Sequence, residues 1–155
     1  MRLLVQRVSR ASVDVGGQRA AGTGPGVLVL AGFGPDDGAD APSRAWWRAM
    51  VEKLPRLRVF PDEAGKMNRS LEDTGGEVLL VSQFTLYADC RKGLRPSFSR
   101  AAEPGLAREL FEKLRADLDA LLPGRVRTGV FGADMDVSLV NQGPVTLMLD
   151  SADFA

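Results

Sequence analysis

Three segments of the sequence carry residue types that chemistry can use and that core packing does not require: 82–86, 91–100 and 141–146. The first, Ser-Gln-Phe-Thr-Leu, follows directly on the apolar run 78–81. A strand that becomes polar at its end can deliver side chains and free backbone N–H groups to a cleft. Such N–H groups could stabilise a developing oxyanion. Taken alone, the pattern favours the simpler interpretation, a strand that emerges into solvent.

Segment 91–100 is a basic loop. It holds four cations within ten residues, with glycine, proline and Phe98 between them. A loop of this composition suits contact with phosphate groups. A solvated loop that binds nothing is the alternative interpretation.

Segment 141–146, Asn-Gln-Gly-Pro-Val-Thr, lies between two apolar runs. Asn, Gly and Pro favour a tight turn, and a plain turn is the interpretation that the pattern favours. The bond between Gly143 and Pro144 could be cis, although only about 5–6% of X–Pro bonds in folded proteins are. Two other stretches are weaker signals, because 65–68 alone indicates a hairpin and both Phe131 and Met135 are more typical of a core.

The absence of histidine limits the chemistry more than any other count. It excludes Ser-His-Asp and Cys-His catalysis, histidine zinc sites and any imidazole acid or base. The single cysteine excludes an internal disulfide framework and multi-cysteine zinc sites. A lysine base remains conceivable, since Ser-Lys pairs exist. The candidate nucleophiles are Ser82, Thr85, Cys90 and Thr146.

Length and composition are those of an ordinary globular protein. The 155 residues suit a single domain over residues 1–155, and 20 basic residues balance 20 acidic ones. Zero net charge argues against a polycationic nucleic-acid binder but allows a local basic patch. Residues 1–11 are too polar for a signal peptide, and no apolar run approaches the roughly 18 residues of a membrane helix. We therefore expect a cytoplasmic protein without a membrane segment.

Apolar patterns predict the elements that position these segments. Helices are expected from Asp40 or Ser43 to about Leu54 and from Pro104 to about Leu121, where Pro123–Gly124 follows. The order of strands and helices predicts an α+β fold, with mixed β-sheet layers and two packed α-helices. Strands are predicted at 3–8, 11–15, 27–31, 57–60, 77–86, 126–131, 137–140 and 145–149.

Several short motifs in this order give the chain a family resemblance. They are Gln6-Arg7-Val8, Ala11-Ser12-Val13, Gly65-Lys66-Met67-Asn68, Ser82-Gln83-Phe84-Thr85-Leu86, Arg95-Pro96-Ser97-Phe98 and Asn141-Gln142-Gly143-Pro144-Val145-Thr146. The chain resembles bacterial D-aminoacyl-tRNA deacylases from residue 1 to about residue 150. Ser-Gln-x-x-Leu and Asn-x-Gly-Pro-x-Thr are the two signatures of that family. Gln142, at a position where acidic residues are common, and a short extra stretch at 121–124 are minor departures.

The resemblance implies a carboxylic ester hydrolase that releases D-amino acids, and glycine, from wrongly charged tRNA and rejects L-aminoacyl-tRNA. It implies a D-aminoacyl-tRNA deacylase-like fold in a homodimer with the active sites at the subunit interface. It also implies a reaction assisted by the 2′-hydroxyl of the terminal ribose, with the protein supplying positioning and an oxyanion hole. No cofactor and no metal ligand is implied.

Roles for individual residues follow from the same resemblance. Ser82, Gln83 and Phe84 would line the pocket, with backbone N–H groups near Gln83 and Phe84 facing the ester oxygen. Thr146 is a further catalytic candidate, ranked below assistance by the substrate because no base is apparent. Gly143 and Pro144 would form a chiral gate that acts in the partner subunit, and Arg7 would hold that turn from the receiving side. Phe131 and Met135 would form the wall on the adenosine side. The tRNA phosphate contacts would be Lys66, Arg91, Lys92 and Arg95.

Two alternatives remain open at this point. A non-catalytic RNA-binding module resembling the editing domains of tRNA synthetases would bind tRNA without deacylating it. A hydrolase that depends on Thr146 or Ser82 as nucleophile would lose its activity when that residue is replaced by alanine.

Overall fold

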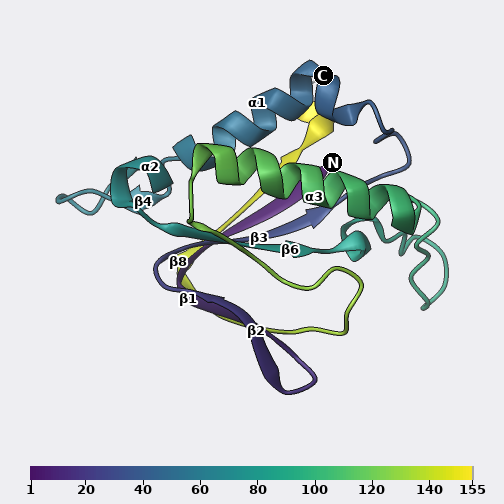
Figure 1. Ribbon diagram of the computed structural model, residues 1–155, viewed down its shortest axis with the longest axis horizontal. Coiled ribbons are helices and arrows are strands. Elements are labelled where there is room, and N and C mark those ends of the chain that lie inside the picture. Colours follow the sequence, from purple (N-terminus) through teal and green to yellow (C-terminus); the bar gives the residue numbers. More distant parts are fainter. Residues whose placement is uncertain (155) are drawn as a thin grey trace.

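A long, bent strand, β1 (Arg2–Val15), organises the main sheet of the computed structural model, which describes residues 1–154 (Figure 1). Along the sheet the order is β2-β1-β3-β6-β7, and β8 also pairs with β1. β3 runs parallel to β6, β6 parallel to β7, and β1 antiparallel to its three partners. The strands are β2 (Gln18–Thr23), β3 (Gly26–Gly32), β6 (Glu77–Ser82), β7 (Val126–Thr128) and β8 (Asp136–Asp150).

Two pairs of predicted strands are single strands in the structure. The predictions at 3–8 and 11–15 fall within β1, and those at 137–140 and 145–149 fall within β8. The first half of β1 pairs with β3 and the second half with β2, while β8 pairs along nearly the whole of β1. Because partners are available along its entire length, β1 continues through the polar stretch 9–10 that separates its two apolar runs.

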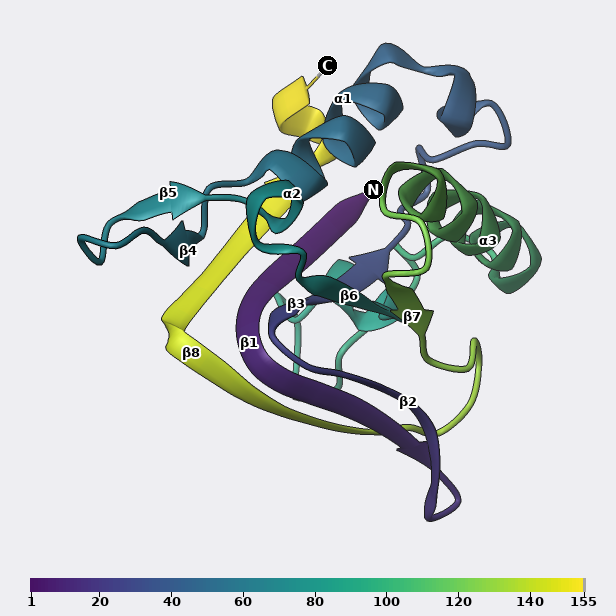
Figure 2. The same cartoon turned by 60° about the vertical axis from the view of Figure 1, so that its left-hand side comes forward.

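Two apolar clusters cover the two faces of the central strands. On one face, alternate residues of β1, β3 and β6 pack against helices α1 (Ala45–Lys53) and α3 (Pro104–Leu121). On the other face, Leu28, Leu79 and Val81 pack against Val8 and Val13 of the bent β1. Figure 2 shows β1 and β8 curving together below β3 and β6. The strand predicted at 27–31 is therefore buried on both faces.

The helices differ from the prediction in two ways: the first helix begins later than expected, and residues 1–154 hold three helices instead of two. α1 begins at Ala45, because Pro42 lies in a separate 3₁₀ turn, η1 (Ala41–Ser43). A second turn, η2 (Leu54–Arg56), extends α1. α3 begins at Pro104 as predicted, and the side chain of Glu103 accepts hydrogen bonds from the first free N–H groups. A third helix, α2 (Leu71–Thr74), is only four residues long and begins with a Ser70–Asp73 capping box.

Three predicted strands are shorter than expected. The strand at 57–60 reduces to β4 (Phe60–Pro61), which pairs with β5 (Met67–Arg69) in a hairpin. β6 ends at Ser82, where the chain enters the 3₁₀ turn η3 (Phe84–Tyr87), and the strand predicted at 126–131 ends at Thr128. The last turn is η4 (Ser151–Phe154). Within residues 1–154, no helix is long and apolar enough to cross a bilayer.

Candidate active site

A cavity of about 470 Å³ lies where β3 and β6 end, next to the start of α3. This volume falls in the range of small-molecule sites, about 300–1,000 Å³. Its lining is mostly apolar, with three polar side chains among aromatic and small residues. The lining residues are Ala31, Gly32, Phe33, Ser82, Gln83, Phe84, Phe98, Ala101, Ala102, Glu103, Pro104, Ala107, Phe131 and Gly132.

The structure brings Ser82, Gln83 and Phe84 together at this cavity. Ser82 pairs with Ala31 at the end of the parallel β3–β6 ladder, so the chain leaves the sheet at the cavity wall. The Phe84 ring is 54% exposed and meets Phe98 edge-on, with 5.0 Å between the ring centroids. The predicted emergence of a polar strand end is therefore an emergence at a cavity rather than into open solvent.

Only one of the two backbone N–H groups expected at an oxyanion is available. The Gln83 N–H donates to the carbonyl of Ala31 at 2.7 Å, so the prediction that it is free is wrong. It continues the parallel ladder by one more rung, which the sequence pattern does not reveal. The Phe84 N–H has no hydrogen-bond acceptor within residues 1–154. It precedes the bonds of η3, the first of which joins the Leu86 N–H to the Gln83 carbonyl.

Phe131 and Met135 separate in the structure. Phe131 is half-buried and lines the cavity, where its ring contacts Phe111 at 5.8 Å between centroids. Met135 does not line this cavity and instead packs into the second apolar cluster, beside Gly129. The expectation that both residues form one wall is wrong for Met135, because the chain reverses through Gly132 before reaching it.

The segment 141–146 is a bulge in β8 and not a hairpin. Thr146 pairs with Gln6 and Asn141 with Val8, so four residues of β8 face the single residue Arg7. The Gly143–Pro144 peptide bond is cis, and Gly143 has φ +121°. Gln142, Gly143 and Pro144 are exposed. The bulge therefore projects from the sheet.

Arg7 supports the bulge of its own chain. Its Nε donates to the Gln142 carbonyl at 3.0 Å, and Nη1 donates to the carbonyl of Val59. The expectation placed Arg7 on the receiving side of a partner's turn. In this structure its guanidinium is already engaged within the chain.

The Thr146 hydroxyl is held by amide donors. Asn141 Nδ2 donates to it at 2.9 Å and Gln6 Nε2 at 3.3 Å. The orientation of the Asn141 amide is fixed, because its Oδ1 accepts from the Val145 N–H at 3.2 Å. Neither donor can remove a proton from Thr146, so this arrangement does not activate the hydroxyl as a nucleophile.

The candidate residues thus form two groups on different strands. Ser82, Ala31, Leu3 and Leu149 lie in register across β6, β3, β1 and β8. The bulge, residues 142–145, lies at least four residues before Leu149 in β8. With strand spacings of about 4.8 Å and a rise of about 3.3 Å per residue, the bulge is roughly 20 Å from Ser82. Figure 2 shows the bend of β8 on the far side of β1 from β3 and β6.

The four predicted phosphate contacts are exposed but differ in what surrounds them. Arg91 is paired with Asp89, with 2.8 Å from Nε to Oδ1, and this guanidinium holds the pKa of the Asp89 carboxyl well below its usual range. Lys92 and Arg95 make no ion pair within residues 1–154. Lys66 lies away from this loop, in the β4–β5 hairpin.

Three aromatic or charged contributors to the cavity were not predicted as site residues. Phe33 and Glu103 line it, and Phe98 reaches it from the basic loop. The signals for Phe98 were its position among cations and its place in the Arg95-Pro96-Ser97-Phe98 motif. Within the described part of the chain, no three His, Cys, Asp or Glu side chains are grouped so that they could hold a metal ion.

Comparison with known proteins places these features in a family. A family model described as D-Tyr-tRNA(Tyr) deacylase matches residues 4–150. The chain is 63% identical to a D-aminoacyl-tRNA deacylase of Solidesulfovibrio magneticus, covering 99% of this chain and 97% of that one. It is 61% identical to a D-aminoacyl-tRNA deacylase of Nitratidesulfovibrio vulgaris, covering 99% and 94%.

Solved structures agree with the α+β prediction. A structure titled c-Myc DNA Unwinding Element Binding Protein superimposes with a TM-score of 0.87 at 39% identity, covering 97% of this chain and 98% of that one. A probable eukaryotic D-amino acid tRNA deacylase has the same fold, with a TM-score of 0.80 at 20% identity over 96% and 97% of the two chains. From the match over 147 of its residues and from these relatives, the chain belongs to the D-Tyr-tRNA(Tyr) deacylase family.

Proposed function

We propose that this protein hydrolyses the ester that joins a D-amino acid to the terminal adenosine of tRNA. The observation that carries this proposal is the cavity itself, which Ser82, Gln83, Phe84 and Phe131 line and beside which the Phe84 N–H has no acceptor within residues 1–154. Aromatic walls suit a nucleobase, and a free N–H suits the oxygen of an ester. The names of relatives that match almost the whole chain support the same reaction.

The proposed mechanism relies on the substrate for its acid and base. Water attacks the ester carbonyl while the terminal 2′-hydroxyl accepts a proton from the water and delivers one to the departing 3′ oxygen. The carbon–oxygen bond to the ribose breaks, which releases the free amino acid and tRNA. The Phe84 N–H donates to the oxyanion that develops at the carbonyl. Ser82 and Gln83 orient the substrate.

Deacylation by the purified protein tests the function directly. D-Tyr-tRNA is expected to be hydrolysed at least about 100-fold faster than L-Tyr-tRNA, a ratio that corresponds to about 2.7 kcal/mol of discrimination. Glycyl-tRNA is expected to be hydrolysed as well, because glycine lacks the Cβ on which the gate would act. Binding of tRNA without any deacylation would instead favour the non-catalytic RNA-binding module.

We further propose that two copies of the chain form the complete site. The roughly 20 Å between the cavity and the bulge at Gly143–Pro144 supports this arrangement, since neither can serve the other within one chain. The edge position of β8 supports it as well. Its residues Val140, Leu147 and Met148 are exposed, and within residues 1–154 β8 pairs only with β1. A long apolar edge strand of this kind is suited to cover by another chain.

In this dimer each bulge enters the cavity of the other subunit. The carbonyls of the bulge would face the Cα of the bound amino acid, where they would obstruct an L side chain and leave room for a D side chain. A two-fold axis gives two equivalent sites. Sedimentation at micromolar concentration is expected to give twice the 16.7 kDa of one chain. A monomer with full activity would contradict the shared site.

The basic loop is proposed to contact tRNA phosphates mainly through Lys92 and Arg95, because Asp89 already neutralises Arg91. Replacing both Lys92 and Arg95 with glutamine is expected to reduce the slope of log K against log salt by about 1.4–1.8. Arg91→Gln is the matched control and should change the slope less. The ratio of D to L activity should stay the same in all three proteins. A slope that the double variant leaves unchanged would identify the loop as merely solvated.

A further inference from the structure

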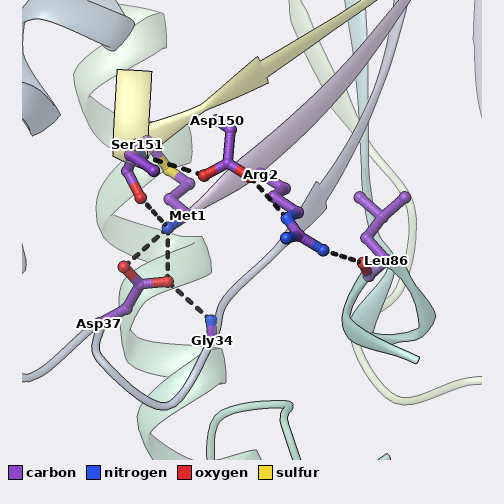
Figure 3. Close-up of polar contacts among 8 residues, drawn as sticks. Met1, Arg2, Gly34, Asp37, Leu86, Asp150 and Ser151 are labelled. Atoms are coloured by element: carbon purple, nitrogen blue, oxygen red, sulfur yellow. Dashed lines mark hydrogen bonds and ion pairs between the residues drawn. The ribbon is translucent and has the colours of Figure 1, made fainter. Parts of the chain in front are cut away.

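A network of charged groups joins the first two residues to two segments that adjoin the cavity lining (Figure 3). The α-amino group of Met1 lies 2.6 Å from Asp37 Oδ2 and donates to Ser151 Oγ at 2.8 Å. Asp37 also accepts from the Gly34 N–H at 2.7 Å. Gly34 directly follows Phe33, which lines the cavity. The amine and Asp37, both buried, therefore hold the loop that continues from β3.

Arg2 contacts η3, the turn that begins at the cavity-lining residue Phe84. Its Nε donates to Asp150 Oδ2 at 2.8 Å, and Nη1 donates to the carbonyl of Leu86 at 2.9 Å. The guanidinium also lies over the ring of Tyr87, 4.5 Å from its centroid. One side chain thus connects the end of β8 to two consecutive residues of η3. Figure 3 shows Arg2 lying between Asp150 and Leu86.

η3 depends on such contacts for its position. It has four residues and none of them is buried, so neither its length nor its own packing fixes it. Two glycines, Gly32 and Gly34, lie close against η3. A Cβ on Gly34 would be 2.3 Å from Tyr87 Cε1, and a Cβ on Gly32 would be 3.2 Å from Leu86 Cβ. The backbone at the end of β3 and just beyond it therefore passes close to η3, and Arg2 also contacts η3.

We propose that Arg2 is a positioning residue for the deacylation reaction, acting through the Leu86 carbonyl and the Tyr87 ring to hold the Phe84 N–H at the cavity. This inference rests on the proposed function. Arg2 itself does not line the cavity. Its planar guanidinium can donate in two directions while its face stacks on an aromatic ring, and the compact ammonium of lysine cannot reproduce that combination.

The ion pair between Arg2 and Asp150 does not by itself explain why an arginine stands at position 2. The two side chains are 33% and 26% exposed, and pairs of this kind contribute little to stability. A structural role would therefore change the melting temperature and kcat together and only slightly. A positioning role would lower kcat strongly and leave both KM and the melting temperature nearly unchanged.

Steady-state kinetics with D-Tyr-tRNA separate these roles. Arg2→Gln is expected to lower kcat by about 10- to 100-fold with KM within about twofold, because small displacements of a catalytic group are costly. Arg2→Lys should recover only part of the loss. Tyr87→Ala removes the ring on which the guanidinium lies and should lower kcat as well. Arg115→Gln removes another paired, partly exposed arginine, on α3, and is the matched control.

A second measurement keeps the inference independent of the activity. In amide NMR spectra, Arg2→Gln and Tyr87→Ala should both shift the Phe84 N–H resonance and speed its exchange with solvent, whereas Arg115→Gln should not. An unchanged Phe84 resonance, a kcat within twofold of wild type, or full recovery by Arg2→Lys would overturn the positioning role. A wild-type protein without deacylase activity would overturn the proposed function, and the Phe84 resonance would still decide the role of Arg2.

Discussion

Gly143→Ala is expected to lower the hydrolysis of D-aminoacyl-tRNA by at least about 100-fold while the protein stays folded. Gly143 has φ +121°, a backbone conformation that residues with a Cβ rarely adopt. A Cβ at this position would lie 2.6 Å from Arg7 Nη2 and 3.1 Å from Val145 Cγ2. The added methyl group therefore meets both an unfavourable dihedral angle and a steric clash.

Movement of Arg7 cannot relieve this clash cheaply. Its guanidinium is bonded to the carbonyls of Gln142 and Val59, so moving it would break the contacts that tie the bulge to the chain before β4. The bulge itself would move instead. Gln142, Gly143 and Pro144 are exposed, so the displacement should cost only about 1–3 kcal/mol of stability. The carbonyls proposed to enter the partner's cavity would nevertheless lose their position.

Single-turnover rates with D-Tyr-tRNA, together with melting temperatures, test this expectation. Gly17→Ala is the matched control, because Gly17 also has a positive φ, +78°, but its Cβ would meet nothing within 4 Å in the β1–β2 turn. Both variants should lose similar stability, and only Gly143→Ala should lose activity. Equal rates in the two variants would show that the bulge has no part in the reaction.

Local sequence patterns predicted most elements of this fold but not how far the strands continue. The α+β class and the start of α3 at Pro104 are as predicted. The polar breaks at 9–10 and 141–146 suggested strand ends, but both lie inside long strands. Pairing with neighbours distant in the sequence holds these strands together, and a local pattern contains no information about such pairing.

The candidate site shows the same limit at the level of single residues. The motif at 82–84 marks a cavity wall, because an apolar run that ends in polar residues is visible in the sequence. Whether each N–H there is free depends on the register between β3 and β6. In this register the Gln83 N–H donates to Ala31, and the Phe84 N–H has no acceptor within residues 1–154. Met135 was misplaced for a similar reason, since the turn at Gly132 directs it to the other cluster.

A tRNA that ends in 2′-deoxyadenosine, carrying D-tyrosine on its 3′ oxygen, is expected to be hydrolysed about 10²–10⁴-fold more slowly than the normal substrate. This is the range that a positioned acid or base contributes, and the mechanism assigns both roles to the missing hydroxyl. The chain has no histidine, and the Thr146 hydroxyl receives hydrogen bonds from two amide donors that cannot accept its proton. The Glu103 carboxylate at the cavity caps α3 by accepting from the Gly105 and Leu106 N–H groups.

The matched protein variants are Ser82→Ala and Thr146→Val, each assayed with the normal substrate. Both hydroxyls lie on surfaces open to water, so water can take over the hydrogen bonds of Asn141 when Thr146 is replaced. If the substrate supplies the base, each variant should stay within about tenfold of wild type, since neither side chain transfers a proton. The deoxy substrate should bind with nearly normal affinity and fail at the chemical step. Abolished activity in Thr146→Val or Ser82→Ala, combined with normal hydrolysis of the deoxy substrate, would instead identify a nucleophilic side chain.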